Sequence, residues 1–287
     1  MIQFANEQTT PLVRQMWKAC FNDTDEFLDL YFQYKYKEEN TLIFFVDGLA
    51  VASLQMLPYE ITFYGEKIPF AYLAGLNTLP EYRRKGYMDR LIHKAHEVLK
   101  ERNIPLSILV PAEEWLFGFY EKYGYEKVFD VGDKPIYPLK KILDSHASLE
   151  DSYKAFNTLY ADQDFCVQKT FIDFQTIVSE QTIDKFPPRF NIAGMARIMD
   201  VPYMLSLYAK NNNSHSFKIS VSDEKTIGVY QIMHGNIQQI DNDVMADVNT
   251  DIRMLCRLLF GYRTSELDIP VSVFFPEHHP VMNLMLE

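Results

Sequence analysis

The feature that most limits the possible folds of this chain is a cationic loop between an apolar run and a predicted amphipathic helix. Residues 70–76 form an extended apolar run, and residues 83–85 are three consecutive cations before Gly86. Apolar residues then recur at helical spacing over residues 87–99. The first amide groups of a helix and its dipole favour an anion, and glycine lets the backbone approach closely. The pattern predicts a cradle for a phosphate-bearing ligand, with an ordinary basic surface turn as the alternative.

A second motif follows the next strand. Residues 106–110 form a continuous apolar run, which is typical of a buried strand. Residues 115–123 then read as a short aromatic helix that Gly124 ends. The sequence over residues 119–125 is F-Y-E-K-Y-G-Y, and its tyrosines can serve either chemistry or core packing.

Taken in this order, the two motifs resemble the GNAT superfamily of N-acetyltransferases. Residues 83–88 are similar to the acyl-CoA pyrophosphate loop, Q/R-x-x-G-x-G/A, with Met88 in place of the usual small residue. Residues 119–125 are similar to the second signature, F-Y-x-K/R-x-G-F/Y. The paired arginines, the single glycine and Met88 resemble the Eis-like (enhanced intracellular survival) branch. The resemblance covers residues 1–150.

The resemblance implies an α+β fold with two domains. Residues 1–132 are expected to form a GNAT domain, a mixed and mostly antiparallel sheet flanked by helices. Residues 133–188 read as a helical connecting segment, either an arm or a reduced middle domain. Residues 189–287 resemble the smaller α+β sterol-carrier-like domain that ends Eis-like proteins, and residues 195–201 resemble its opening strand.

The resemblance also implies acetyl-CoA as the cosubstrate and assigns residues to it. The strand before the loop is implied to end in a bulge whose free amide groups face the thioester carbonyl. A plain turn before Pro80 is the alternative for that strand end. The expected cofactor-binding residues are Leu76, Asn77, Thr78, Arg83, Arg84, Lys85, Gly86, Tyr87 and Met88.

Two catalytic residues are expected. The resemblance assigns Tyr120 as the proton donor to the leaving thiolate, a role that suits a phenol with a reference pKa of about 10. In Eis-like enzymes the C-terminal carboxylate enters the first domain's site and accepts the amine proton, which implies this role for Glu287. The apolar tail over residues 279–287 suits docking. A frayed terminus or a vector-derived Leu-Glu ending is the alternative.

The acceptor is expected to be a primary amine of a small cationic molecule, such as a polyamine or aminoglycoside, or of a peptide. A net charge of −11, spread over both halves, argues against nucleic acid and suits a cation. Asp25, Glu26 and Glu113 are candidates to bind that substrate, and the alternative, which is the more usual one for such residues, is that they are helix-start or solvated charges. Transfer is expected to be direct, in a ternary complex, because no cysteine is expected near either motif to form an acyl-enzyme.

The sequence gives no indication of metal binding, membrane insertion or secretion. The three cysteines, Cys20, Cys166 and Cys256, have no spacing typical of metal ligands or of a disulfide framework. No targeting segment and no membrane-length apolar run is evident, so a cytoplasmic protein is expected. A non-catalytic acyl-CoA sensor with a lipid-binding C-terminal domain is the rival hypothesis. Acyl-chain length, the identity of the amine and a homo-oligomeric state stay open.

Overall fold

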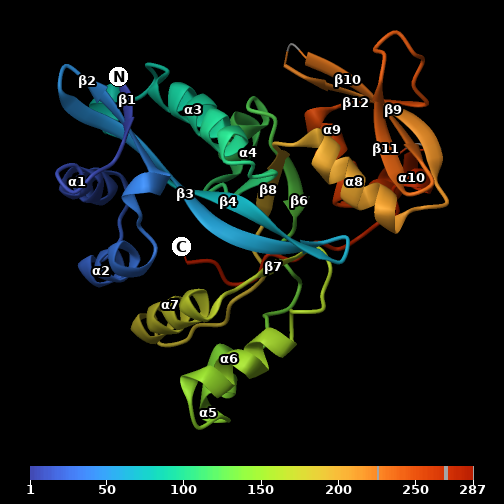
Figure 1. Ribbon diagram of the computed structural model, residues 1–287. Coiled ribbons are helices and arrows are strands. Elements are labelled where there is room, and N and C mark those ends of the chain that lie inside the picture. The colour runs from blue at the N-terminus through green and yellow to red at the C-terminus, as the bar shows by residue number, and fades with distance from the viewer. Residues whose placement is uncertain (225, 268–270, 287) are drawn as a thin grey trace.

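The computed structural model describes residues 1–224, 226–267 and 271–286. It contains an eight-stranded sheet flanked by helices and a four-stranded sheet near the C-terminus (Figure 1). The larger sheet is mixed and mostly antiparallel, so the predicted α+β fold is confirmed. No helix among these residues is long and apolar enough to cross a membrane.

The larger sheet runs in the order β1-β2-β3-β4-β5-β8-β6, and β7 pairs with β3 off this path. β4 and β5 are parallel, whereas the other neighbouring strands are antiparallel. The strands are β1 (Ile2–Phe4), β2 (Thr41–Val46), β3 (Leu49–Phe63), β4 (Glu66–Thr78), β5 (Leu106–Leu109), β6 (Glu126–Phe129), β7 (Cys166–Gln168) and β8 (Gly194–Ile198).

Two pairs of helices cover opposite faces of this sheet (Figure 1). On one face, α1 buries Trp17 and α2 buries Tyr31 against β3 and β4. The Thr24 hydroxyl caps α2 by accepting a hydrogen bond from the Phe27 amide at 3.2 Å. The other face is covered by α3 and α4. The four helices are α1 (Thr10–Cys20), α2 (Asp25–Tyr34), α3 (Tyr87–Glu101) and α4 (Glu114–Glu121).

Residues 130–193 connect β6 to β8 and are partly joined to the larger sheet. Their strand β7 pairs with the far half of β3, so this segment is attached to the larger sheet. Its helices share a small apolar cluster with Leu284 of the C-terminal tail. Thr170 and Asp173 form a capping box at the start of the last helix. The helices are α5 (Leu139–Asp144), α6 (Leu149–Thr158) and α7 (Phe171–Ile183).

The strand expected over residues 195–201 forms at Gly194–Ile198, but it lies in the larger sheet. It is inserted between β5 and β6 and pairs antiparallel with both. It therefore completes the first sheet, and the expectation that it opens the C-terminal domain is corrected. All five of its residues are buried, and such a strand carries no pattern that assigns it to one sheet rather than another. The boundaries after residues 132 and 188 stay predictions.

The C-terminal part is built on a β9-β10-β11 meander, with β12 parallel to β9. Arg197 of β8 joins it to the larger sheet, because its guanidinium binds the Tyr123 carbonyl at 2.8 Å and Asp223 at 2.9 Å. The elements are α8 (Val201–Asn211), β9 (Ser216–Asp223), β10 (Thr226–Met233), β11 (Asn236–Ile240), β12 (Val248–Asp251), α9 (Ile252–Leu259) and α10 (Val271–Phe274).

The C-terminal tail returns from this part to the larger sheet and runs past β7 toward α2 (Figure 1). Val281 exchanges backbone hydrogen bonds with Phe165 and Val167, at 2.8 and 3.0 Å. The Met282 carbonyl accepts a bond from the Ile192 amide at 2.8 Å. The next four residues, 283–286, are buried, so the tail is part of the packed structure.

Candidate active site

Strand β4 separates from β5 in the middle of the sheet. The pairing with β5 ends at Leu73, whereas β4 continues to Thr78. Between Ala74 and Asn77, β4 has one more residue than the facing part of β3, which is a β-bulge. The end of β4 therefore has backbone groups facing the side that β5 has left. A bulge at this place is what the family resemblance implies.

Gly75 lies within the bulge, and only glycine fits there. Its φ is +58°, and an added Cβ would lie 2.4 Å from Cζ3 of Trp17. Asn77 is buried and holds the bulge, because its Nδ2 donates to the Ser53 hydroxyl and to the Gly75 carbonyl, both at 2.9 Å. Asn77 therefore fixes the backbone shape of the strand end. Gly75 was not identified from the sequence as a residue of the site.

A pocket of about 360 Å³, here called the central pocket, opens beside the bulge. Its walls come from α1, α2, the end of β4, the start of α4 and the C-terminal tail. Six of its sixteen lining residues are aromatic, and Asp23 is the acidic residue among those described. The lining residues are Trp17, Phe21, Asn22, Asp23, Phe27, Tyr31, Tyr72, Leu73, Ala74, Gly75, Leu76, Val110, Ala112, Leu116, Tyr120 and Leu286.

Tyr120 is brought into this pocket together with Leu76, one of the predicted cofactor residues. It lies near the end of α4 and is 6% exposed. Burial raises the pKa of its phenol, and the nearby Tyr123 raises it further by a smaller amount. The phenol therefore stays protonated near neutral pH and is available as a proton donor.

The cationic loop lies directly beyond the end of β4. Arg83 is tied to it, since its Nε donates to the Thr78 carbonyl at 3.0 Å. Gly86 is the N-cap of α3 with a φ of +77°, and an added Cβ would meet nothing within 4 Å. Arg84 and Lys85, which directly precede this helix start, are exposed. The loop thus presents open backbone, a helix N-terminus and three cations close to the central pocket.

The last two predicted cofactor residues belong to the start of α3. Tyr87 and Met88 are half-buried and pack against the apolar cluster between α3 and the sheet. The Tyr87 ring lies 4.7 Å from the Phe44 ring between centroids. Packing of the helix start explains why a bulky residue stands at position 88.

The acids predicted to bind substrate lie outside the lining of the central pocket. Asp25 is exposed and paired with Lys18 at 2.6 Å, and Glu26 is exposed. Glu113 is exposed and accepts the Trp115 indole N–H at 2.6 Å. Among the described residues, Asp23 is the acid that lines the pocket, and it accepts the indole N–H of Trp17 at 2.7 Å.

The aromatic wall was not predicted. Trp17, Phe27 and Tyr31 read from the sequence only as apolar helix positions, and Tyr72 as part of a strand. Behind them, the buried Gln55 accepts the Tyr31 hydroxyl at 2.9 Å, and its Nε2 has no partner among the described residues. No local pattern separates pocket aromatics from core aromatics, because the fold alone decides which face becomes hollow.

Cys20 corrects the expectation that no cysteine is near the motifs. The fold places its Sγ 3.4 Å from the Thr78 carbonyl, beside Arg83. Burial raises the pKa of this thiol, although Arg83 and the Thr78 bond oppose the shift. Cys20 is not among the residues lining the central pocket, and as a neutral thiol it is a weak nucleophile.

Glu287, the second predicted catalytic residue, lies outside the described residues. The residue before it, Leu286, is 3% exposed and lines the central pocket. The tail therefore reaches the same pocket as Tyr120. Over residues 1–224, 226–267 and 271–286, no three His, Cys, Asp or Glu side chains gather closely enough to hold a metal ion.

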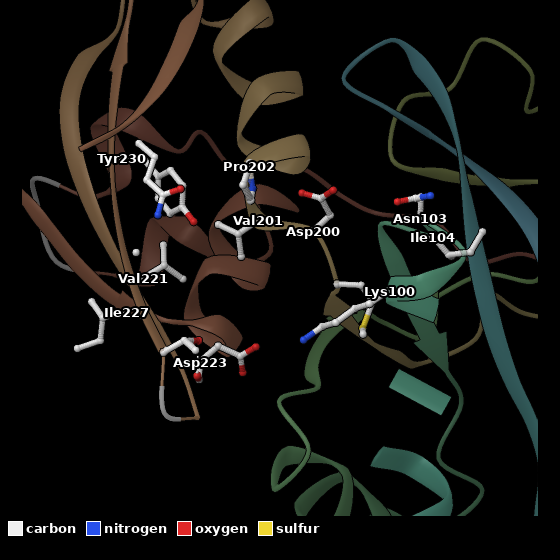
Figure 2. Close-up of a pocket in the computed structure, with 14 residues that line it drawn as sticks. Lys100, Asn103, Ile104, Asp200, Val201, Pro202, Val221, Asp223, Ile227 and Tyr230 are labelled. Atoms are coloured by element: carbon white, nitrogen blue, oxygen red, sulfur yellow. Dashed lines mark hydrogen bonds between the residues drawn. The ribbon is translucent and has the colours of Figure 1, made fainter. Parts of the chain in front are cut away.

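A second cleft, also about 360 Å³, lies between the C-terminal end of α3 and the four-stranded sheet (Figure 2). Figure 2 shows Lys100 pointing into it from α3, with Asp200 and Asp223 on the facing elements. The 15 residues of α3 span about 22 Å at 1.5 Å per residue, so this cleft is far from Gly86 at the other end. It is a separate feature from the central pocket.

Comparisons with known proteins agree with this geometry. A model of the acetyltransferase (GNAT) domain matches residues 1–128. A probable N-acyltransferase from Enterococcus faecalis V583 is 14% identical, with a TM-score of 0.73 over 99% of both chains. A GCN5-related N-acetyltransferase from Kribbella flavida is 13% identical, with a TM-score of 0.65 over 100% of this chain and 97% of its own. Eis1 from Mycobacterium abscessus is 13% identical, with a TM-score of 0.61 over 91% and 90%.

No curated protein matches the sequence. The structural likenesses, at 14% identity or less, concern the fold. The family match covers the residues that carry the bulge, the cationic loop and Tyr120. Residues 1–128 match the acetyltransferase (GNAT) domain, and this match supports an acyltransferase.

Proposed function

We propose that this protein is an acetyl-CoA-dependent N-acetyltransferase that acts on a primary amine by direct transfer in a ternary complex. The observation that carries the proposal is the meeting of three features at one place. The β4 bulge, the cationic start of α3 and Tyr120 all border or adjoin the central pocket. Each feature suits a different part of a thioester cosubstrate.

The loop over residues 83–88 is proposed to hold the pyrophosphate of acetyl-CoA. The exposed side chains of Arg84 and Lys85 provide charge, and the open space at Gly86 admits the phosphates to the helix amides. Arg83 is already bonded to the Thr78 carbonyl, so its main role is to fix the loop against the strand end. Tyr87 and Met88 support the loop by packing against the apolar cluster between α3 and the sheet.

The strand end is proposed to place the thioester. Backbone amide groups at the bulge, around Leu76, lie on the side of β4 that β5 has left. A pre-arranged amide donor near a carbonyl oxygen stabilises the negative charge that develops there during attack. Asn77 and Gly75 keep this backbone in shape.

Tyr120 is proposed to give its proton to the departing thiolate. Its raised pKa keeps it protonated before the reaction, and its position in the pocket wall suits contact with the sulfur. A carboxylate at Glu287, the residue that follows Leu286, is proposed to accept the amine proton, directly or through water. The burial of the tail from Asn283 to Leu286 supports this proposal.

The acceptor is proposed to be a small cationic amine, with a peptide amine as the nearest alternative. The rings of Trp17, Tyr31 and Tyr72 offer aromatic faces to an ammonium group, and Asp23 offers a carboxylate. The layout is proposed to be Eis-like, with a sterol-carrier-like C-terminal part whose role is to frame the pocket and deliver the tail.

A measurement of CoA release with a panel of amines tests the proposal. Polyamines, aminoglycosides and peptides are supplied with acetyl-CoA, and free thiol is followed over time. Release that depends on an amine supports an N-acetyltransferase. Tight binding of acetyl-CoA without release for any amine contradicts it and favours an acyl-CoA sensor.

A further inference from the structure

A larger pocket, of about 580 Å³, lies at the C-terminal end of α2. We call it the lysine pocket. It lies between the end of α2, the β3–β4 hairpin and the start of α7, and it shares no lining residue with the central pocket. Its lining residues are Tyr34, Lys35, Lys37, Leu57, Pro58, Tyr59, Glu60, Lys67, Pro69, Tyr153, Asn157, Gln168, Lys169, Thr170, Phe171, Ile172 and Asp173.

Two of its lysines are buried, which is rare unless each has a partner. Lys35 is 8% exposed and forms an ion pair with Asp173. Lys169 is 5% exposed, and its Nζ donates to the neutral side chain of Asn283 at 3.0 Å. No carboxylate in the described part of the chain lies within ion-pair distance of Lys169. Burial lowers the pKa of Lys169 to about 7.

Asp173 carries one negative charge, so it cannot neutralise both cations, and its two oxygens are already bonded to other groups. One oxygen accepts the Thr170 amide at 2.8 Å and the Thr170 hydroxyl at 2.7 Å in the capping box of α7. The other accepts Lys35. The buried charged groups of the pocket are thus Lys35, Lys169 and Asp173, with a net charge of one positive unit when Lys169 is protonated, as it is below pH 7. The other charged residues of the lining, Lys37, Glu60 and Lys67, are exposed.

The rest of the lining suits an anion attached to a flat apolar body. The start of α7 faces the pocket, and its capping box uses the amides of Thr170 and Asp173, leaving those of Phe171 and Ile172 as donors. The Tyr59 ring lies 4.3 Å from Lys35 Nζ and 6.0 Å from Lys169 Nζ. Tyr34, Tyr153 and Phe171 add further aromatic surface.

We propose that the lysine pocket binds a small monoanionic carboxylate with an aromatic or flat apolar body. Lys169 would take the carboxylate, and the tyrosine and phenylalanine rings would contact the body. A monoanion matches the single unit of uncompensated charge, whereas a dianion would leave an excess negative charge in a buried place. This site is separate from acetyl transfer and does not depend on the proposed function.

Calorimetric titration of the full chain with benzoate tests this proposal. Benzamide has nearly the same shape without the charge, and it is the matched neutral probe. Losing a charge-assisted hydrogen bond costs about 1.5–3 kcal/mol, so benzoate should bind roughly 10- to 100-fold more tightly than benzamide. Benzoate that binds no more tightly than benzamide, or not at all up to about 10 mM, overturns the proposal.

Two variants locate the site. Lys169→Met keeps the length of the apolar stem, and it should lower benzoate affinity by the same roughly 10- to 100-fold while leaving benzamide binding unchanged. Lys37→Met removes an exposed lysine at the rim, and it should change benzoate affinity by less than about threefold because the charge there is screened by water. Equal effects of the two variants overturn the proposal. The wild-type comparison of benzoate with benzamide decides the matter even when Lys169→Met does not fold.

Discussion

Replacing Gly75 by alanine is expected to destabilise the protein and to deform the central pocket. The φ of +58° is unfavourable for a residue with a Cβ, at a cost of about 1–2 kcal/mol. The new Cβ would also lie 2.4 Å from Trp17 Cζ3 and 2.9 Å from Gln55 Nε2, far inside normal contact. Overpacking of this kind costs about 1–3 kcal/mol. The free energy of unfolding should therefore fall by about 2–5 kcal/mol.

Urea unfolding of matched glycine variants separates the two contributions. Gly86→Ala has the same backbone problem, with a φ of +77°, but no atom within 4 Å of the new Cβ, so it should lose only about 1–2 kcal/mol. Gly118→Ala lies within α4 with open space around it, and it should gain up to about 1 kcal/mol. Equal losses for Gly75→Ala and Gly86→Ala would refute the tight packing of Trp17 over the bulge.

Three further predictions follow from the buried polar groups and the tail. Deleting residues 284–287 should lower turnover strongly, and unchanged turnover in a chain that still unfolds cooperatively in urea would exclude the tail from catalysis. Asp173→Asn leaves Lys35 buried without its carboxylate and should lower the free energy of unfolding by about 3–5 kcal/mol, whereas an unchanged urea midpoint would contradict the ion pair. Lys169 binds a proton more weakly in the folded protein, with a pKa of about 7, than in the unfolded chain, so the free energy of unfolding should rise with pH above 7. That gain, about 2 kcal/mol between pH 7 and 9, should disappear in Lys169→Met, and an equal gain in both proteins would contradict the burial of its charge.

Structural features that depend on residues close together in the sequence could be predicted. The cationic loop before α3 and the motif around Tyr120 are read from short runs, because a helix start and a glycine stop depend on local chemistry. The Asp47-Gly48 pair, a residue pair typical of tight hairpin turns, joins β2 to β3, and both residues adopt positive φ. The bulge in β4 was implied by the family resemblance and not by the local pattern.

Features made by distant segments were not predictable. β8 pairs with β5, although nearly ninety residues separate the two strands in the sequence. The sequence of a wholly buried strand contains no pattern that identifies its neighbouring strands. The partners Lys35 and Asp173 are 138 residues apart in sequence. Cys20 reaches Thr78 across 58 residues. Such contacts depend on the complete topology, which a pattern along the chain does not contain.

The turnover of Tyr120→Phe tests the central claim most directly. The substitution removes only the hydroxyl, so the ring should keep its packing beside Phe119 and Tyr125, and the urea midpoint and acetyl-CoA affinity should stay close to those of the wild type. Loss of a positioned proton donor should reduce amine-dependent CoA release by roughly 100- to 10,000-fold. Near wild-type turnover with unchanged acetyl-CoA binding would remove Tyr120 from the mechanism and contradict the assignment of the central pocket as the site of acetyl transfer.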